Sequence, residues 1–220
     1  MGRARRSDGD ATRESILEAA GELIAEKGFA QTPNKEIAKK AGVDLAAINY
    51  HFGGRDGLYL AVLSLAHHHY LDGDQLAELA ASDLSSDEKL GIFLETFLTK
   101  LSNPGDWHGR VFARELLSPS VQLGDFVNTE GIKKIQSVRQ IVGEAAGLSE
   151  DDPRLLPCML SVVAPCMMLM VAGNRIPGPV QEIVAMQAKA LTMHFKIFTL
   201  AGLKAIREQS DQYSSTFRTL

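Results

Sequence analysis

Asn49 carries a side-chain amide within LAAINYHF, a run of otherwise apolar and ring-bearing residues. An amide on the outer side of a helix can hydrogen-bond the edge that adenine exposes in the DNA major groove. Ala46 and Ala47 come shortly before it, and their small side chains leave such a helix slim enough to enter the groove. These residue types therefore indicate a helix that reads double-stranded DNA.

Two short helices joined by a tight turn are expected to present this segment. Thr32 can cap the first helix, and Pro33 suits its first position, where a missing N–H costs nothing. Gly42 is placed to end that helix in a left-handed conformation, and Asp44 can cap the second helix. Ile48 would anchor the second helix to the core. The spacing predicts a helix-turn-helix, and an ordinary helical hairpin is the alternative.

The same segment resembles the TetR family of transcriptional regulators over about residues 12–63. The resemblance rests on Gly28-Phe29, Thr32-Pro33, Ile37-Ala38, Ala41-Gly42-Val43 and Tyr50-His51-Phe52. This chain has Asp44 and Asn49 where the family commonly has serine and tyrosine. We therefore do not expect its operator to have the same sequence as the operators of its relatives.

The resemblance implies an all-α fold, with an N-terminal three-helix helix-turn-helix domain and a larger C-terminal helical domain for ligand binding and dimerisation. We expect the boundaries 1–54 and 55–208, followed by a flexible tail over 209–220. The last two helices would pair with those of a second copy as a four-helix bundle. The interface residues expected from this pairing are Val184, Ala188, Leu191 and Phe195.

DNA contacts follow from placing residues 44–51 in a major groove. The candidates for base contacts are Lys35, Leu45, Ala46 and Asn49. The candidates for phosphate contacts are Thr32, Ala47, Tyr50, His51 and Arg55. Leu45 also lies near the expected core face, so its role as a base contact is open.

Helical patterns continue along the whole chain, and no alternating β-branched run predicts a sheet. The expected helices cover about 12–27, 55–71, 107–117, 121–146, 154–174 and 179–206. One further helix opens at a capping box formed by Ser85 and Glu88 and ends at Asn103-Pro104-Gly105.

Charge is unevenly distributed along the 220 residues, whose composition is that of a soluble globular protein. The net charge is −4, but nine basic and nine acidic residues balance up to Tyr70, so the acidic excess lies outside the DNA-binding segment. Arg3, Arg5 and Arg6 form a basic arm before the first expected helix. Such an arm can lie along phosphates or in a minor groove, and a disordered tail is an equal alternative.

An uncharged stretch between Arg154 and Arg175 is long enough to cross a membrane. Pro157 and Pro165 interrupt it, which favours a buried helix that faces a ligand cavity and a partner subunit. Cys158 and Cys166 fit no common metal spacing, and no secretion signal precedes them. We therefore expect a cytoplasmic protein with no membrane partner.

An effector pocket is expected where WHGRVFARELLSP, residues 107–119, meets the methionines of the uncharged stretch. The candidate residues are Trp107, Arg110, Phe112, Arg114, Glu115, Phe126, Met159, Met167, Met168 and Met170. The alternative is a methionine-rich core with a surface ion pair. The Arg-Glu-x-x-x-Pro run and NYHFGGRDGLY resemble the CecR-type branch of TetR regulators, which is associated with membrane transport and drug sensitivity.

Three adjacent histidines, His67 to His69, point about 100° apart on a helix and cannot converge on one metal ion. No catalytic set or cofactor-binding motif stands out, so we expect neither an enzyme, a metal site nor a cofactor. The leading hypothesis is a homodimeric repressor that binds an inverted-repeat operator and is released by a small-molecule effector. The alternatives are an architectural DNA-binding protein without an effector and an enzyme on a helical scaffold.

Overall fold

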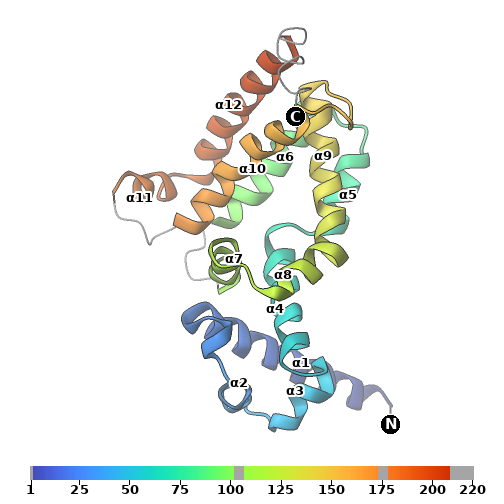
Figure 1. Ribbon diagram of the computed structural model, residues 1–220, viewed down its shortest axis with the longest axis vertical. Helices are drawn as coiled ribbons and strands as arrows, with labels where there is room; N and C mark the ends of the chain where they lie inside the picture. The colour runs from blue at the N-terminus through green and yellow to red at the C-terminus, as the bar shows by residue number, and fades with distance from the viewer. Residues whose placement is uncertain (1, 102–106, 173–177, 209–220) are drawn as a thin grey trace. The chain divides into compact units, whose positions relative to one another are not determined.

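A computed structural model describes residues 2–101, 107–172 and 178–208 (Figure 1). All regular structure in these ranges is helical, which confirms the all-α prediction. The helices form two compact units. The N-terminal unit comprises residues 1–69 and 105–129, and the C-terminal unit comprises residues 70–104 and 130–220. The expected tail, 209–220, lies outside the described residues.

The N-terminal unit contains the predicted helix-turn-helix. Its helices are α1 (Gly2–Lys27), the 3₁₀ turn η1 (Phe29–Gln31), α2 (Asn34–Ala41), α3 (Leu45–Phe52), α4 (Arg55–Tyr70, whose last residue belongs to the other unit), α7 (Trp107–Leu117) and α8 (Val121–Phe126). α1 begins ten residues earlier than expected. Arg3, Arg5 and Arg6 therefore continue this helix in the backbone, and their side chains lie outside the description.

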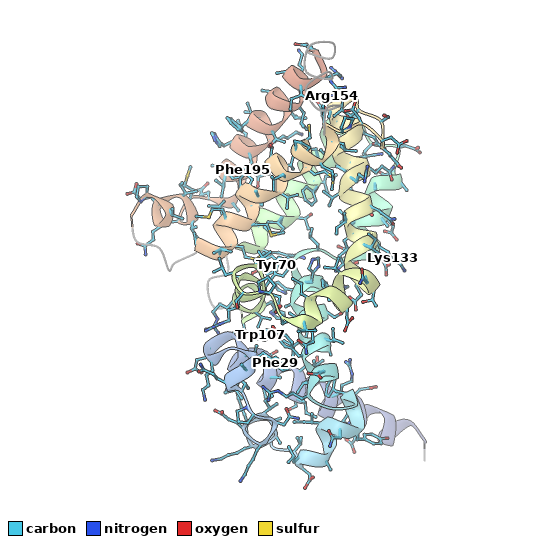
Figure 2. The ribbon with its side chains drawn as sticks, viewed as in Figure 1. Phe29, Tyr70, Trp107, Lys133, Arg154 and Phe195 are labelled. Atoms are coloured by element: carbon cyan, nitrogen blue, oxygen red, sulfur yellow. The ribbon has the colours of Figure 1, made fainter. Side chains whose placement is uncertain are left out.

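One apolar core joins α1, α3, α4 and α7 in the N-terminal unit. Ile16, Ile48, Val62 and Val111 are fully or almost fully buried in it. A Cβ on Gly21 of α1 would lie 2.5 Å from the Trp107 ring, so only glycine allows this approach of the indole (Trp107 is labelled in Figure 2). This shared core explains why the structural division differs from the expected boundary after residue 54.

The C-terminal unit contains α5 (Gly73–Ala81), α6 (Ser86–Leu101), α9 (Ile132–Ala146), α10 (Leu155–Ala172), α11 (Pro179–Val184) and α12 (Ala188–Glu208). Two helices that were expected to be continuous are interrupted. A π-helical turn, η2 (Val127–Gly131), separates α8 from α9, and residues 185–187 separate α11 from α12. No proline or glycine marks the second break, so the sequence pattern did not reveal it.

Polar contacts fix several helices of the C-terminal unit. Ser85 and Glu88 form the predicted capping box, in which the Ser85 N–H donates to Glu88 Oε2 at 3.0 Å. The buried Lys89 ammonium donates to Ala80 O and to Glu144 Oε2, both at 2.8 Å. Lys89 thereby joins α6 to the end of α5 and to α9.

α10 is long and apolar enough to span a membrane by length and composition alone. In the structure it packs against α6, α9 and α12. It continues through Pro165 and buries Cys158 and Cys166, and burial raises the pKa of the Cys166 thiol to about 12. The expectation of a buried helix is met only on one part of its surface, because Leu156, Leu160 and Met168 are exposed. The expected end of the helix at Asn174 lies outside the described residues.

Candidate nucleic-acid interface

α3 is capped at its start by Asp44, as the sequence indicated, and it ends at Gly53. The Asp44 side chain accepts a hydrogen bond from the Ala46 N–H at 2.7 Å, which caps the start of the helix. Gly53 ends it in the left-handed conformation, with its N–H donating to Asn49 O at 2.9 Å. Gly42 likewise ends α2 in the left-handed conformation. The predicted turn and the Asp44 cap are confirmed.

One face of α3 is exposed and the opposite face is anchored. Ile48 is fully buried, whereas Leu45 is 48% and Tyr50 85% exposed. Ala46 and Asn49 are exposed on the same side. The uncertainty over Leu45 is thus resolved in favour of the outer face. Leu45, Ala46, Asn49 and Tyr50 thus form an exposed surface that is available to a groove.

The residues that flank this face differ in how exposed they are. Lys35 on α2 is exposed, while Ala47 and His51 on α3 are half-buried. The Arg13 guanidinium lies over the Phe52 ring, 5.2 Å from its centroid, and so connects α1 to the end of α3. These contacts fix the orientation of α3 within the N-terminal unit.

Thr32 was expected to cap α2 and to contact a phosphate, but it is buried and stabilises the turn before α2 instead. Its hydroxyl donates to Gly28 O at 2.8 Å and does not cap α2, whose N-cap residue is Pro33. The side chain is 1% exposed, and its own N–H donates to Phe29 O at 3.2 Å. In this conformation Thr32 offers no donor to a phosphate.

Arg55 is also engaged inside the N-terminal unit. Its guanidinium donates to Thr32 O at 2.7 Å and to Phe29 O, and it lies 4.4 Å from the centroid of the Phe29 ring. The guanidinium therefore satisfies carbonyls of the turn before α2, which corrects the expectation of a phosphate contact.

The residues of the expected effector pocket are divided between the two units. Trp107, Phe112 and Phe126 are buried in the N-terminal unit, where the His67 ring lies 5.0 Å from Phe112 and 4.9 Å from Phe126. Arg110 is half-buried on the same helix as Trp107. Met159, Met167, Met168 and Met170 lie on α10 of the C-terminal unit.

Arg114 and Glu115 join the helices of the N-terminal unit. Arg114 Nε donates to Ala25 O at 3.0 Å and its Nη2 to Glu26 O at 2.7 Å, which satisfies carbonyls at the end of α1. The Glu115 carboxylate is buried and accepts hydrogen bonds from the Tyr59 hydroxyl and the Ser120 N–H. The expectation that these residues orient an effector is therefore replaced by a structural role.

Burial and the bond to Glu115 raise the pKa of Tyr59. A raised pKa in the folded state means that stability is present below the unfolded pKa of tyrosine, about 10, and is lost as the pH rises above it. We expect the free energy of unfolding to fall between pH 10 and 11, and to fall less steeply in Tyr59→Phe. Chemical unfolding at each pH measures this difference. Equal slopes in the two proteins would contradict a buried, proton-retaining Tyr59.

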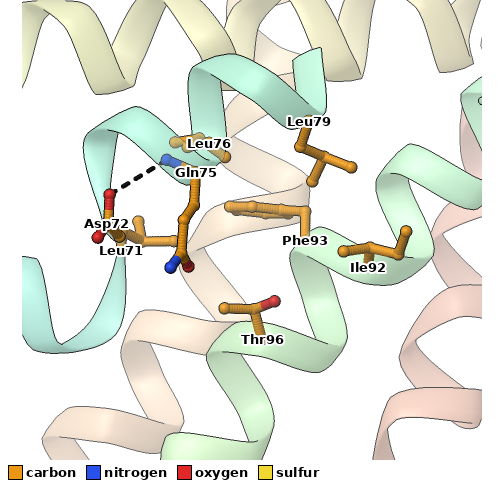
Figure 3. Close-up of a pocket in the computed structure, with 8 residues that line it drawn as sticks. All are labelled: Leu71, Asp72, Gln75, Leu76, Leu79, Ile92, Phe93 and Thr96. Carbon is orange, nitrogen blue, oxygen red and sulfur yellow. Dashed lines mark hydrogen bonds between the residues drawn. The ribbon is translucent and has the colours of Figure 1, made fainter. Parts of the chain in front are cut away.

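A cavity of about 100 Å3 opens between α5 and α6 of the C-terminal unit (Figure 3). It is lined by Leu71, Asp72, Gln75, Leu76, Leu79, Ile92, Phe93 and Thr96. None of these residues belongs to the expected pocket. No residue pattern indicated this cavity, because a cavity depends on the space left between packed helices.

Of the four expected interface residues, Val184 lies on α11 and the others on α12, and none of them is among the exposed residues. Leu191 is buried within its own subunit, while Val184, Ala188 and Phe195 are half-buried. The large exposed apolar residues are Met193, Ile197 and Phe198 on α12, and Leu156, Leu160 and Met168 on α10.

A helix-turn-helix unit joined to a separate helical unit is typical of a class of DNA-binding transcriptional regulators. Comparison with known families identifies the family. The family "Bacterial regulatory proteins, tetR family" matches residues 16–62, and the family "HTH-type transcriptional dual regulator CecR, C-terminal domain" matches residues 87–206. The chain belongs to the TetR family and has a CecR-type C-terminal domain.

Individual relatives agree with this assignment. The probable HTH-type transcriptional regulator YttP of Bacillus subtilis is 30% identical over 60% of this chain and 64% of its own length. The chain therefore spans less than two thirds of this relative. FadR of Bacillus halodurans has a TM-score of 0.67 at 18% identity, covering 88% of this chain and 96% of that one. FadR of Bacillus subtilis, solved with stearoyl-CoA, has a TM-score of 0.65 at 20% identity, covering 86% and 98%. These structures share the fold.

Proposed function

We propose that this TetR-family regulator is a homodimeric, effector-responsive repressor that reads an inverted-repeat operator with α3. The observation that carries the proposal is the outer face of α3, where Leu45, Ala46, Asn49 and Tyr50 are exposed above the buried Ile48. A rigid anchor and a slim outer face are what groove reading requires.

Base and phosphate contacts are assigned to different parts of this face. Leu45, Ala46, Asn49 and the exposed Lys35 contact base edges, and Asn49 pairs with adenine. Tyr50, His51 and the backbone at Ala47 contact phosphates, which fix the position of the helix without reading sequence.

Two-fold symmetry is the second part of the proposal. The exposed residues Leu156 and Leu160 are four positions apart and share one side of α10, and Met168 is exposed about two turns further along. Ile197 and Phe198 expose a comparable apolar side on α12. A second copy covers these faces as a four-helix bundle, and the resulting two-fold axis matches an inverted repeat.

The effector binds the C-terminal unit and favours a dimer whose reading helices no longer match the operator, so DNA affinity falls by population shift. The CecR-type domain and the FadR structure solved with stearoyl-CoA support a response to a small molecule. The regulated genes belong to membrane transport or drug sensitivity, as in the CecR-type branch. The protein acts in the cytoplasm.

Selection of binding sites from random DNA, followed by footprinting, tests the proposal. The expected site is an inverted repeat protected by one or more dimers. Repeating the titration with a panel of metabolites and drugs should identify compounds that weaken binding. Weak sequence preference and no response to any compound would instead support an architectural DNA-binding protein.

Asn49→Ala tests base reading. We expect a loss of about 1–3 kcal/mol in binding free energy at one base-pair position, because a bidentate adenine contact disappears. Tyr50→Phe is the matched control, since losing a phosphate contact weakens all sequences alike. Titrations against single-base variants of the selected site measure both. A uniform loss with Asn49→Ala would show that Asn49 does not read a base.

A further inference from the structure

The cavity between α5 and α6 has apolar walls and a polar side. Leu76 and Leu79 of α5 face Ile92 and Phe93 of α6, and Figure 3 shows the Phe93 ring between Leu76 and Thr96. Pockets of this composition bind an apolar body, while a few polar groups fix its orientation.

The volume limits what the cavity accepts. About 100 Å3 corresponds to a body about the size of one six-membered ring or a short branched chain, since a dry cavity of about 150 Å3 holds benzene. Full-size ligand pockets reach about 300–1,000 Å3. A long acyl chain or a multi-ring compound would extend out of it through its opening.

The carboxylate at the polar side already has hydrogen-bond partners. The Asp72 carboxylate accepts hydrogen bonds from the N–H groups of Asp74 at 2.9 Å and Gln75 at 3.1 Å. The buried Lys134 side chain passes close to Gly73, where a Cβ would lie 3.2 Å from its Cε. Burial lowers the pKa of Lys134, while the charges of Glu130, Asp72 and Asp74 act in the opposite direction.

The uncharged polar groups of the lining are the Gln75 amide and the Thr96 hydroxyl. An ionic ligand would bring an additional charge against apolar walls, which costs more than placing a hydroxyl or amide there. A neutral polar group can hydrogen-bond to either side chain without disturbing the groups around Asp72.

We propose that this cavity binds the effector, and that the effector is a small uncharged amphipath with one ring or a short branched chain. The apolar body contacts Phe93 and Leu76, and its hydroxyl or amide group bonds Thr96 or Gln75. The inference rests on the proposed effector response and adds its site and ligand class.

The test titrates the full-length protein with four probes of one shape: benzyl alcohol, toluene, benzoate and benzylammonium. Methyl chemical shifts of leucine and isoleucine report binding and its place. We expect benzyl alcohol to bind at least about tenfold more tightly than either ion. Thr96→Val should weaken benzyl alcohol about threefold to tenfold and leave toluene unchanged. Thermal melts confirm that each variant is folded.

Ile92→Phe, at the rim of the cavity, should fill its opening and lower the affinity for benzyl alcohol at least about tenfold. Ile135→Phe on α9 is the matched control, since Ile92 is 40% and Ile135 44% exposed. Loss of binding in both variants, or in neither, would overturn the site. Equal affinity for ions and alcohol would overturn the ligand class.

Operator titrations on the same preparations separate this inference from the proposed function. Benzyl alcohol should weaken DNA binding of the wild type but not of Ile92→Phe. Binding in the cavity without any change in operator affinity would overturn its regulatory role. A protein that selects no DNA site at all would refute the proposed function, while the probe titrations would still decide the site.

Discussion

Gly57→Ala is expected to disrupt the N-terminal unit and abolish operator binding. Gly57 lies in the first turn of α4, and a Cβ there would lie 1.9 Å from Phe52 O and 3.1 Å from Phe52 C. Both atoms belong to the backbone at the end of α3, so no side-chain rotation relieves the overlap. α3 and α4 would have to move apart.

Two effects of this substitution oppose one another. Alanine is favoured over glycine in a helix by about 1 kcal/mol. The backbone overlap places the change among the strongly destabilising substitutions, above about 4 kcal/mol. The steric effect therefore dominates, and the exposed face of α3 loses its fixed position.

Chemical unfolding and operator titration measure the two consequences. Gly124→Ala is the matched control, because Gly124 lies in α8 of the same unit and a Cβ there meets nothing within 4 Å. It should be as stable as the wild type or slightly more so. If Gly57→Ala unfolds at the same denaturant concentration as this control, the close approach of α4 to α3 is wrong.

The helix-turn-helix could be predicted because its signals are local. Gly42 and Asp44 act on backbone groups within a few residues of themselves, so their spacing alone defines the turn and the start of α3. Arg55 and Arg114 were misjudged because their partners lie 23–26 and 88–89 residues away. Nothing in a local pattern distinguishes such a side chain from one that contacts phosphate or effector.

The side of α12 that is left exposed could not be predicted from the sequence for another reason. Leu191 is buried, whereas Phe198, seven residues later and therefore on nearly the same side of α12, is 76% exposed. A helical period reveals that apolar residues share a side, but not which neighbour covers that side. Only the packing of α12 against α6 and α9 decides which face is left exposed.

Phe198→Asp is expected to convert the proposed dimer into monomers. Phe198 is 76% exposed on α12, and within the dimer a carboxylate at this position would be buried without a partner. Leu160→Asp on α10, where Leu160 is 67% exposed, should have the same effect from the other helix of the face. Each substitution leaves the isolated subunit almost unchanged, because each replaces a side chain that its own core does not use.

The loss of DNA affinity should exceed that of any single base contact. A dimer binds its second half-site intramolecularly, which strengthens binding about 10²–10⁴-fold over one half-site. We therefore expect operator affinity to fall at least about 100-fold, while the weak affinity for an isolated half-site stays the same. Sedimentation and titrations on full and half operators measure these quantities. Ile135→Asp on α9, outside the proposed face, should remain dimeric. Monomers that bind the full operator as tightly as the wild type would show that α3 reads DNA without two-fold pairing.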